Sequence, residues 1–455
     1  MSAVAAREVA PRGPTGPPAP SRAYLDALAA RTRRRRAEHV PLASSHQGAP
    51  GHLSDAVAAT LAGLEGDLGA LAGTLFDLAE EAFEEHRSVA ALALLLRRHG
   101  LAVETGTHGL ATSLRAGLGR GGPTVAVLAE YDALPSIGHA CGHNLIATAA
   151  VGAVLALAAL PERDRPGRVL LLGTPAEEGS SGKELLARQG FFDGVDAAIM
   201  VHPFGYDVVD QPFLGRRQLV VTYRGVAAHA AAQPYLGRNA LDAVALNYQA
   251  VALLRQHIPP SDRVHGVVRE GGERPSVVPE RASVEYYVRS AHAETLLDLS
   301  RRLEDVAHGV ARATGTVAEL TWDPLPFTLP VRTNDPLARR WVHHQGARGR
   351  TVLSRGVVPE ELAASTDFGN VSARVPGIHP MIAVSAPDVA LHTRAFAEAV
   401  ASPAGLVAAL DGAYGLAMTA LDWLHDAELR EAVAADFERA GGMLDVERYF
   451  SREDR

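Results

Sequence analysis

The sequence predicts an α/β protein with a mixed, mostly parallel sheet between helices and a smaller ferredoxin-like α+β domain inserted into it. Apolar runs with strand composition alternate with helical stretches, which is typical of a sheet that is covered on both faces. Residues 216–327 interrupt this pattern with the order β-α-β-β-α-β. We therefore expect a larger domain, residues 53–215 and 328–445, and an inserted lid or dimerisation domain, residues 216–327.

The separate elements follow from hydrophobic periodicity, taken in chain order. Leucines at spacings of three and four from Leu61 to Leu75 predict a helix, and a second is expected over residues 90–99. In the larger domain we expect strands at 125–128, 169–172, 197–201 and 381–384, and a helix at 147–160. In the inserted domain we expect strands at 218–223, 264–268, 282–288 and 316–320, and helices at 239–256 and 294–313.

The first 52 residues differ in composition from the rest of the chain. They are rich in Pro, Ala, Gly, Ser and Arg and have little apolar periodicity. Such a segment buries too little surface to offset chain entropy, so residues 1–52 are expected to form a disordered tail. The basic run from Arg31 to Arg36 is either a solvated face, which is the simpler interpretation, or a contact for an anionic partner.

Composition narrows the class of protein and its partners. The chain has 52 acidic and 44 basic residues, and a net charge of −8 does not favour binding to nucleic acid. We find no apolar run near the roughly 18 residues of a membrane span and no apolar core of a signal peptide, so no membrane partner is expected. The single cysteine excludes an internal disulfide and favours a reducing, cytoplasmic location.

That cysteine lies in the segment Gly-His-Ala-Cys-Gly-His-Asn, residues 138–144, which follows the first expected strand of the sheet. Cys141 and His143 are two residues apart in a glycine-containing turn, so a thiolate and an imidazole can reach one cation. The alternative is a buried cysteine beside a hydrogen-bonded histidine. From this segment alone the two interpretations are about equally supported.

Two adjacent glutamates, Glu177 and Glu178, follow the next expected strand. Adjacent carboxylates repel each other unless a cation lies beside them. Metal hydrolases need one carboxylate to hold the ion and another to take a proton from the attacking water. A solvated acidic turn is the alternative, but a position between a buried strand and the glycine-rich segment 179–182 favours a functional pair.

Two histidines are the remaining candidate ligands. His202 follows the expected strand at 197–201 and precedes a proline that fixes its orientation, and His392 follows the strand at 381–384. Either histidine alone is as readily structural as functional. Ligands of such sheets gather at the carboxyl ends of the strands, however, so we expect the candidates to converge on one metal site.

The inserted domain carries three further polar candidates. His229 lies among small residues that leave room for a substrate. Asn239 lies near the start of an expected helix, where capping is the simpler explanation. Arg289 follows a strand and is either a surface charge or a clamp for a carboxylate.

Together these motifs resemble the M20 metallopeptidase family of aminoacylases, aminobenzoyl-glutamate hydrolases and auxin-conjugate amidohydrolases. The sequence is most similar to the branch with bacterial aminobenzoyl-glutamate hydrolase and an animal dipeptidase that cleaves β-alanyl-lysine-type dipeptides. Asn144, where auxin-conjugate hydrolases usually carry aspartate, favours this branch. The resemblance covers residues from about 55 to 440. The matching segments, in the family's order, are 132–135, 138–144, 175–179, 228–230, 237–242, 365–370 and 391–393.

The resemblance implies a centre of two divalent metal ions per subunit in the larger, catalytic domain. Thiolate and imidazole ligands favour Zn²⁺, and a carboxylate-containing pair of sites also takes Mn²⁺. Cys141 would bridge the two ions. The implied ligands are Cys141, His143, Glu178, His202 and His392.

The resemblance also implies catalytic roles. Glu177 would act as general base and then as general acid toward the leaving amine. His229 would reach the active site of the partner subunit and stabilise the oxyanion, so a homodimer is expected. Asn239 and Arg289 would help to bind the carboxylate of the substrate.

The expected function is metal-dependent hydrolysis of the amide bond of an N-acyl amino acid or unusual dipeptide. A catalytically silent member that binds a ligand or stabilises a partner is the alternative, which the complete ligand set and the presence of Glu177 disfavour. Ureido hydrolysis usually involves a different ligand set. Nucleobase deamination is disfavoured because its His-x-Glu and Pro-Cys-x-x-Cys segments are absent.

Overall fold

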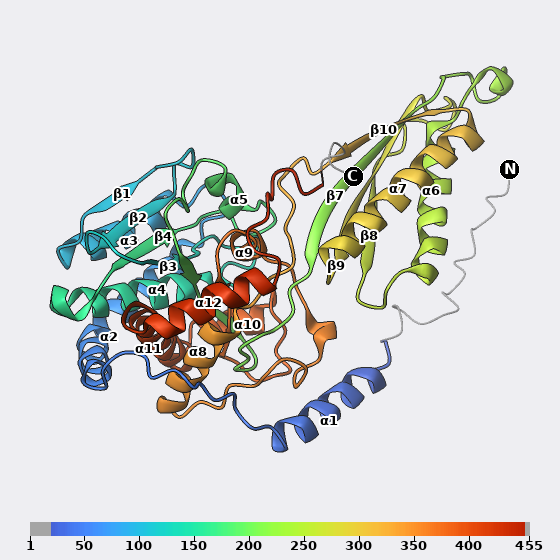
Figure 1. The fold of residues 1–455 in the computed structure, drawn as a ribbon. Helices are drawn as coiled ribbons and strands as arrows, with labels where there is room; N and C mark the ends of the chain where they lie inside the picture. The colour runs from blue at the N-terminus through green and yellow to red at the C-terminus, as the bar shows by residue number, and fades with distance from the viewer. Residues whose placement is uncertain (1–19, 451–455) are drawn as a thin grey trace, which may run out of the picture. The chain divides into compact units, whose positions relative to one another are not determined.

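A computed structural model describes residues 20–450 of the protein (Figure 1). The chain divides into two compact units, Met1–Val40 and Pro41–Arg455. The described part of the first unit contains helix α1 (Ala23–Ala37), which has exposed arginines in its last turn. Cations at the C-terminus of a helix interact favourably with the helix dipole, so the basic run is compatible with this helix.

The expectation of disorder over residues 1–52 differs from the described part of that interval. Besides α1, the segment that precedes α2 (His52–Leu78) is held by hydrogen bonds within the second unit. The backbone N–H groups of Gly48 and Ala49 donate to carboxylates of Asp426 and Asp422. These polar contacts with residues far along the chain have no periodic signal in the sequence. Residues 1–19 lie outside the described residues.

A six-stranded mixed sheet forms the centre of the second unit, with the order β1-β2-β4-β3-β5-β11. The last four strands are parallel to one another, and the first two are antiparallel to their neighbours. Every residue of β3 is buried, as expected for a central strand. The strands are β1 (Val103–Thr105), β2 (Leu114–Leu118), β3 (Thr124–Ala129), β4 (Arg168–Gly173), β5 (Ala197–Ile199) and β11 (Gly377–Ile378).

Helices cover both faces of this sheet. Val125 and Val127 of β3 belong to the largest hydrophobic core, together with residues of α2, α4 and α11, whereas Ala126 and Leu128 belong to a second core on the opposite face. This alternation shows that β3 packs against helices on both faces of the sheet. The helices of this domain are α3 (His86–Arg98), α4 (His143–Ala158), α5 (Gly182–Ala187), α8 (Asp335–Ala347), α9 (Phe368–Ser372), α10 (Arg394–Val400), α11 (Pro403–His425) and α12 (Ala427–Arg439).

Helix α11 corrects the expectation that no stretch is apolar and long enough for a membrane span. It passes that test by length and composition alone, but 78% of its apolar window is buried in the protein. Sequence inspection missed it because Asp411 and Asp422 interrupt the apolar run. Both aspartates are buried and pair with arginines, which suits a helix in the core of the domain.

The fourth expected strand, at 381–384, is present but lies outside the six-stranded sheet. It forms β12 (Met381–Ala383), which pairs in parallel with β6 (His202–Phe204) in a separate two-stranded sheet. Pro380 lies between β11 and β12, and proline has no N–H to donate to a hydrogen-bonded ladder. The main sheet ends instead in the short strand β11, which periodicity did not reveal.

The inserted domain has the predicted β-α-β-β-α-β order, and its sheet is antiparallel with the strand order β10-β7-β9-β8. Figure 1 shows α6 and α7 beside each other along this sheet, and they share a separate hydrophobic core with it. The predicted fold class is therefore confirmed, and the boundaries 53–215, 216–327 and 328–445 remain a proposal. The elements are β7 (Gly215–Arg224), α6 (Ala240–Leu254), β8 (Arg263–Glu270), β9 (Arg281–Ser290), α7 (Ala293–Thr314) and β10 (Val317–Trp322).

Candidate active site

The five predicted ligands lie at one end of the main sheet, beyond the carboxyl ends of its parallel strands. Cys141 lies in the turn between β3 and α4, His143 is the first residue of α4, and Glu178 follows β4. His202 begins β6, and His392 lies in the loop before α10. The convergence expected from strand ends is thus present, because the parallel strands deliver their following loops to the same edge.

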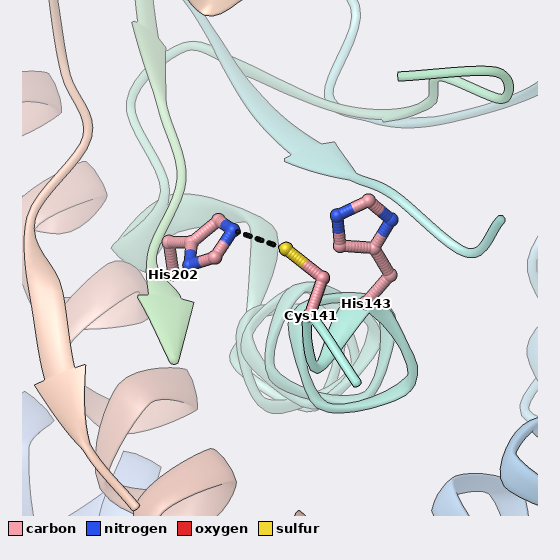
Figure 2. A group of neighbouring side chains, drawn as sticks. All are labelled: Cys141, His143 and His202. Atoms are coloured by element: carbon pink, nitrogen blue, oxygen red, sulfur yellow. Dashed lines mark hydrogen bonds between the residues drawn. The ribbon is translucent and has the colours of Figure 1, made fainter. Parts of the chain in front are cut away.

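The turn that carries Cys141 requires glycine at position 142. Gly142 has φ of +86°, and a Cβ atom there would lie 2.8 Å from Cγ of Pro203. The close approach of this turn to Pro203 brings the cysteine beside the neighbouring histidine, His202. Their Sγ and Nε2 atoms are 3.5 Å apart. Figure 2 shows the sulfur of Cys141 between the rings of His143 and His202.

The ligand atoms fall into overlapping groups, within each of which all atoms lie within 4.8 Å of one another. Nε2 of His392 is 3.6 Å from Oε1 of Glu178, and Nε2 of His143 is 3.9 Å from the same oxygen. His392 is the exposed member of the set and lies at the rim, whereas Cys141, His143 and His202 are buried. The three groups are Cys141–His143–His202, Cys141–Glu178–His392 and His143–Glu177–Glu178.

Hydrogen bonds fix which ring nitrogen of each buried histidine faces the cluster. Nδ1 of His202 donates to the carbonyl oxygen of Pro203 at 2.8 Å, and Nδ1 of His143 lies 3.0 Å from Oδ1 of Asp132. Both rings therefore present Nε2 to the cluster, as metal-binding histidines do. Oδ2 of Asp132 also accepts the backbone N–H of Glu178 at 2.9 Å, so one aspartate orients two ligands.

Without a cation, the ionised forms of the thiol and of one glutamate in the cluster are disfavoured. Burial and the carboxylate of Glu178 raise the pKa of Cys141 well above its usual value. Burial, together with Glu130 and Glu178, likewise raises the pKa of Glu177 well above the ordinary range. A cation would reverse both effects, because it stabilises a thiolate and neighbouring carboxylates.

Several buried polar atoms at the same point have no hydrogen-bond partner. They include Nε2 of His143 and Oε1 of Glu178, two of the predicted ligand atoms. Burying such atoms unpaired is unfavourable, and a metal ion would satisfy them. The donor set of thiol, imidazole and carboxylate thus fits divalent metal ions.

The three predicted residues of the inserted domain are held within that domain. Nδ1 of the exposed His229 accepts the N–H of Ala232 at 3.1 Å. The side chain of Asn239 caps α6 by accepting the N–H of Leu241 at 2.9 Å. Helix capping was the simpler explanation for this residue. The guanidinium of Arg289 is half-buried and lies 5.2 Å from the ring centre of Tyr287. Their roles toward a substrate remain predictions.

The profile of Peptidase family M20/M25/M40 matches residues 126–403, which is more than half of the chain. The chain belongs to this family. The relatives with similar sequences include proteins of the branch that the motifs resemble. An Xaa-Arg dipeptidase of Mus musculus is 37% identical over 383 residues, covering 81% of this chain and 88% of the relative. A p-aminobenzoyl-glutamate hydrolase chain of Escherichia coli K12 is 32% identical over 396 residues, covering 71% of this chain and 82% of the relative.

Solved structures support the same fold. An aminobenzoyl-glutamate utilization protein of Klebsiella pneumoniae superposes with a TM-score of 0.62 at 21% identity, covering 80% of this chain and 98% of that one. A dinuclear metal-binding M20 peptidase of Bacillus subtilis superposes with a TM-score of 0.61 at 21% identity, covering 78% of this chain and 98% of that one. The predicted family and enzyme class, an amidohydrolase, are confirmed, and the silent alternative is not favoured.

Sequence reasoning missed a buried ion network behind the ligands of this M20 chain. Lys183 of α5 is fully buried and pairs with Glu130 and with Asp367, the latter at 2.6 Å. Oε2 of Glu130 lies 3.4 Å from Nε2 of His143, so the network touches a predicted ligand. The only signal in the sequence was that Glu130 and Asp367 flank or belong to matching motifs. Nothing around Lys183 distinguished it from a surface lysine at the start of a helix.

Proposed function

We propose that this protein hydrolyses the amide bond of a dipeptide or N-acyl amino acid with the help of two divalent metal ions. The observation that carries the proposal is the convergence of a thiol, three imidazoles and a carboxylate beside a second carboxylate, Glu177. When bound, such ions polarise the scissile carbonyl and make water a stronger nucleophile near neutral pH.

The grouping of the ligand atoms supports two ion positions with Cys141 between them. Cys141 belongs to one group with His143 and His202, and to another with Glu178 and His392. His143 and Glu178 also belong to two groups each, so the choice of Cys141 as the shared ligand rests on the resemblance to the family. Thiolate and imidazole ligands favour Zn²⁺ on softness, whereas the glutamate also suits Mn²⁺.

We assign proton transfer to Glu177. Its carboxylate is adjacent to the ligand Glu178 and lies in a group with His143, so it is within reach of the reacting centre. It would accept a proton from the attacking water and deliver it to the nitrogen of the leaving amine. Replacement by glutamine would keep the shape of the side chain while removing its basicity.

A homodimer would supply the remaining groups. The outer edge of β8 and the neighbouring α6 expose apolar side chains, including Val267 (55% exposed) and Leu253 (65% exposed). An exposed apolar strand edge is a natural surface for pairing with a second copy. We propose that pairing brings the partner subunit's His229 to the oxyanion and allows Asn239 and Arg289 to bind the substrate carboxylate.

The substrate class follows from the relatives and remains a proposal for this chain. Dipeptides with a C-terminal arginine or lysine, β-alanyl dipeptides and aminobenzoyl-glutamate are the compounds to compare. Nucleic acid and membranes are not proposed as partners. We propose a cytoplasmic location because the single cysteine is free and its proposed role requires a reduced thiol.

The test is amine release from these compounds and from N-acetyl amino acids, with Glu177→Gln as the inactive control. We expect release from at least one class, its loss with a chelator, and its return with Zn²⁺ or Mn²⁺. Release that persists in Glu177→Gln would overturn the assigned role of this residue. Metal-loaded protein that is silent on every compound would overturn the proposed substrate class.

A further inference from the structure

The backbone immediately before Glu177 has an unfavourable conformation. Ala176 has φ of +59°, in the left-handed region where its Cβ crowds the backbone, although it is not a glycine. The loop is also tightly folded, because a Cβ atom at Gly182 would lie 1.9 Å from the carbonyl oxygen of Pro175. A residue in this conformation persists only when its surroundings hold it there.

The group that holds Ala176 is the buried carboxylate of Glu85. Its Oε1 accepts the N–H of Ala176 at 2.8 Å, and its Oε2 accepts the hydroxyl of Thr112 at 2.7 Å. The carbonyl oxygen of Thr112 accepts the hydroxyl of Tyr131 at 2.6 Å, and Tyr131 directly precedes Asp132. All these side chains are buried, so the contacts are shielded from water.

The side chain of Glu85 thus links the segment that precedes Asp132 to the segment that precedes Glu177. Glu85 comes from the segment before α3, outside the seven motifs, and is 91 residues from Ala176 in the chain. Burial and the nearby Asp132 raise the pKa of Glu85 to about 7, so the carboxylate is held where its charge is disfavoured. Among residues 20–450, Glu85 belongs to no group that could hold a metal ion and forms no ion pair.

We propose that Glu85 is a positioning residue, which holds Ala176 in the left-handed conformation and thereby aims the carboxylate of Glu177 at the attacking water. The inference rests on the proposed role of Glu177 as general base. It deepens that role by naming what fixes the geometry of the base. Small displacements of a catalytic group lower the rate of the chemical step more than they weaken substrate binding.

The test compares three substitutions of Glu85 in the metal-loaded enzyme. Glu85→Gln keeps an oxygen that accepts from Ala176, and its amide donates to Thr112, so we expect kcat close to that of the wild type. Glu85→Met removes the acceptor, and Glu85→Asp withdraws it by one methylene. For both we expect kcat to fall by about 10- to 100-fold, with KM and bound metal little changed.

A double-mutant cycle separates positioning from a general loss of structure. Glycine adopts positive φ without strain, so Ala176→Gly should make the loop less dependent on Glu85. We expect the loss of kcat caused by Glu85→Asp to be at least severalfold smaller in the Ala176→Gly background. Glu80→Gln is the matched control, because Glu80 lies in the same segment but caps α3 through the N–H of Ser88.

The outcomes distinguish the two proposals. If Glu177→Gln is inactive while Glu85→Met and Glu85→Asp both keep wild-type kcat, the positioning role is wrong and the proposed function stands. An equal loss in both backgrounds, or loss of metal together with activity, would likewise overturn the positioning role. If Glu177→Gln keeps turnover, the role of Glu177 as general base is wrong, and the positioning role that rests on it is wrong as well. Metal-loaded wild-type protein that is silent on every compound would instead overturn the proposed function. Should Glu85→Met not fold, Glu85→Asp carries the same comparison.

Discussion

At the scale of single residues, Asp132 does most to fix the orientation of the predicted metal ligands. Its two carboxylate oxygens contact the ring of His143 and the backbone of Glu178. Burial raises the pKa of Asp132, but the charge and hydrogen bond of His143 outweigh burial and lower it overall. A negative charge on Asp132 would make the predicted ligand His143 a stronger ligand.

Asp132→Asn should weaken metal binding by about 10- to 100-fold without unfolding the protein. The amide keeps the size of the side chain but removes the charge and one of the acceptors. The measurement is competition with a chromophoric chelator. Asp196→Asn is the control, because Asp196 also accepts a backbone N–H, that of Thr124, at the amino end of the same sheet. Equal affinity in the two variants would contradict the role of Asp132.

The raised pKa of Glu85 leads us to expect that the stability of the protein depends on pH. Its pKa is about 7 in the folded chain against 4.5 as the ordinary value, so folding favours the protonated form. The resulting stabilisation is fully present below about pH 4.5 and is lost as pH rises through 7. The difference in unfolding free energy between wild type and Glu85→Gln should change by up to about 3 kcal/mol over this window. Urea titrations at several pH values measure it, and parallel curves would contradict the shift.

At the scale of elements, the short helix α5 is joined to the rest of the site by Lys183. Its ammonium contacts carboxylates from the end of β3 and from the segment before α9, which are 53 and 184 residues away in sequence. Lys183 and Glu130 partly neutralise each other beside the ligand His143. The network thus connects α5 to the metal-ligand cluster.

Lys183→Met should destabilise the protein by roughly 3–5 kcal/mol, because it leaves two buried carboxylates without their partner. Adding Glu130→Gln and Asp367→Asn should recover part of that loss. The measurement is the urea concentration at the midpoint of unfolding, compared between variants whose unfolding free energies depend on urea with the same slope. Arg188→Met is the control at the C-cap of the same helix, since Arg188 is more exposed than Lys183 and its partner Glu184 keeps a second cation, Arg374. A similar effect from both single substitutions would contradict the network.

The elements that the sequence predicts best are those with a long periodic signal. The leucines of α2, the apolar strands β3 and β4, and all six elements of the inserted domain follow from periodicity within a few residues. The strands β1, β2, β6 and β11 were missed; β1, β6 and β11 have only two or three residues, which carry no period. The equally short β5 and β12 were found because each lies within a longer apolar run. The partners of Lys183 and Glu85 were missed because they depend on contacts between distant segments, which one sequence does not display.

At the scale of the whole molecule, the inserted domain has its own hydrophobic core and its own sheet. The motifs pointed to the ligand cluster because strand ends converge in parallel sheets. They do not determine what His229 and Arg289 bind, because in the proposed dimer this depends on a second copy of the chain. For this reason the dimer is a proposal that needs a test of its own.

A mixture of two inactive variants provides that test. Glu177→Gln should lack the base, and His229→Ala should lack the group offered to the partner. In a mixed dimer one of the two sites has both groups, so random exchange of subunits should restore about one quarter of wild-type activity. The measurement is turnover after co-refolding, with each variant alone as the control. No recovery in dimers that have demonstrably mixed would contradict sharing of His229.

The pairing of β11 with β5 has a consequence for synthesis of the chain on the ribosome. Residues 377–378 complete the main sheet beside β5, and the whole inserted domain lies between these strands in the sequence. The inserted domain therefore emerges complete while one edge of the main sheet is still open. The last predicted ligand, His392, emerges later still, so the predicted ligand set is complete only when nearly nine-tenths of the chain has been made.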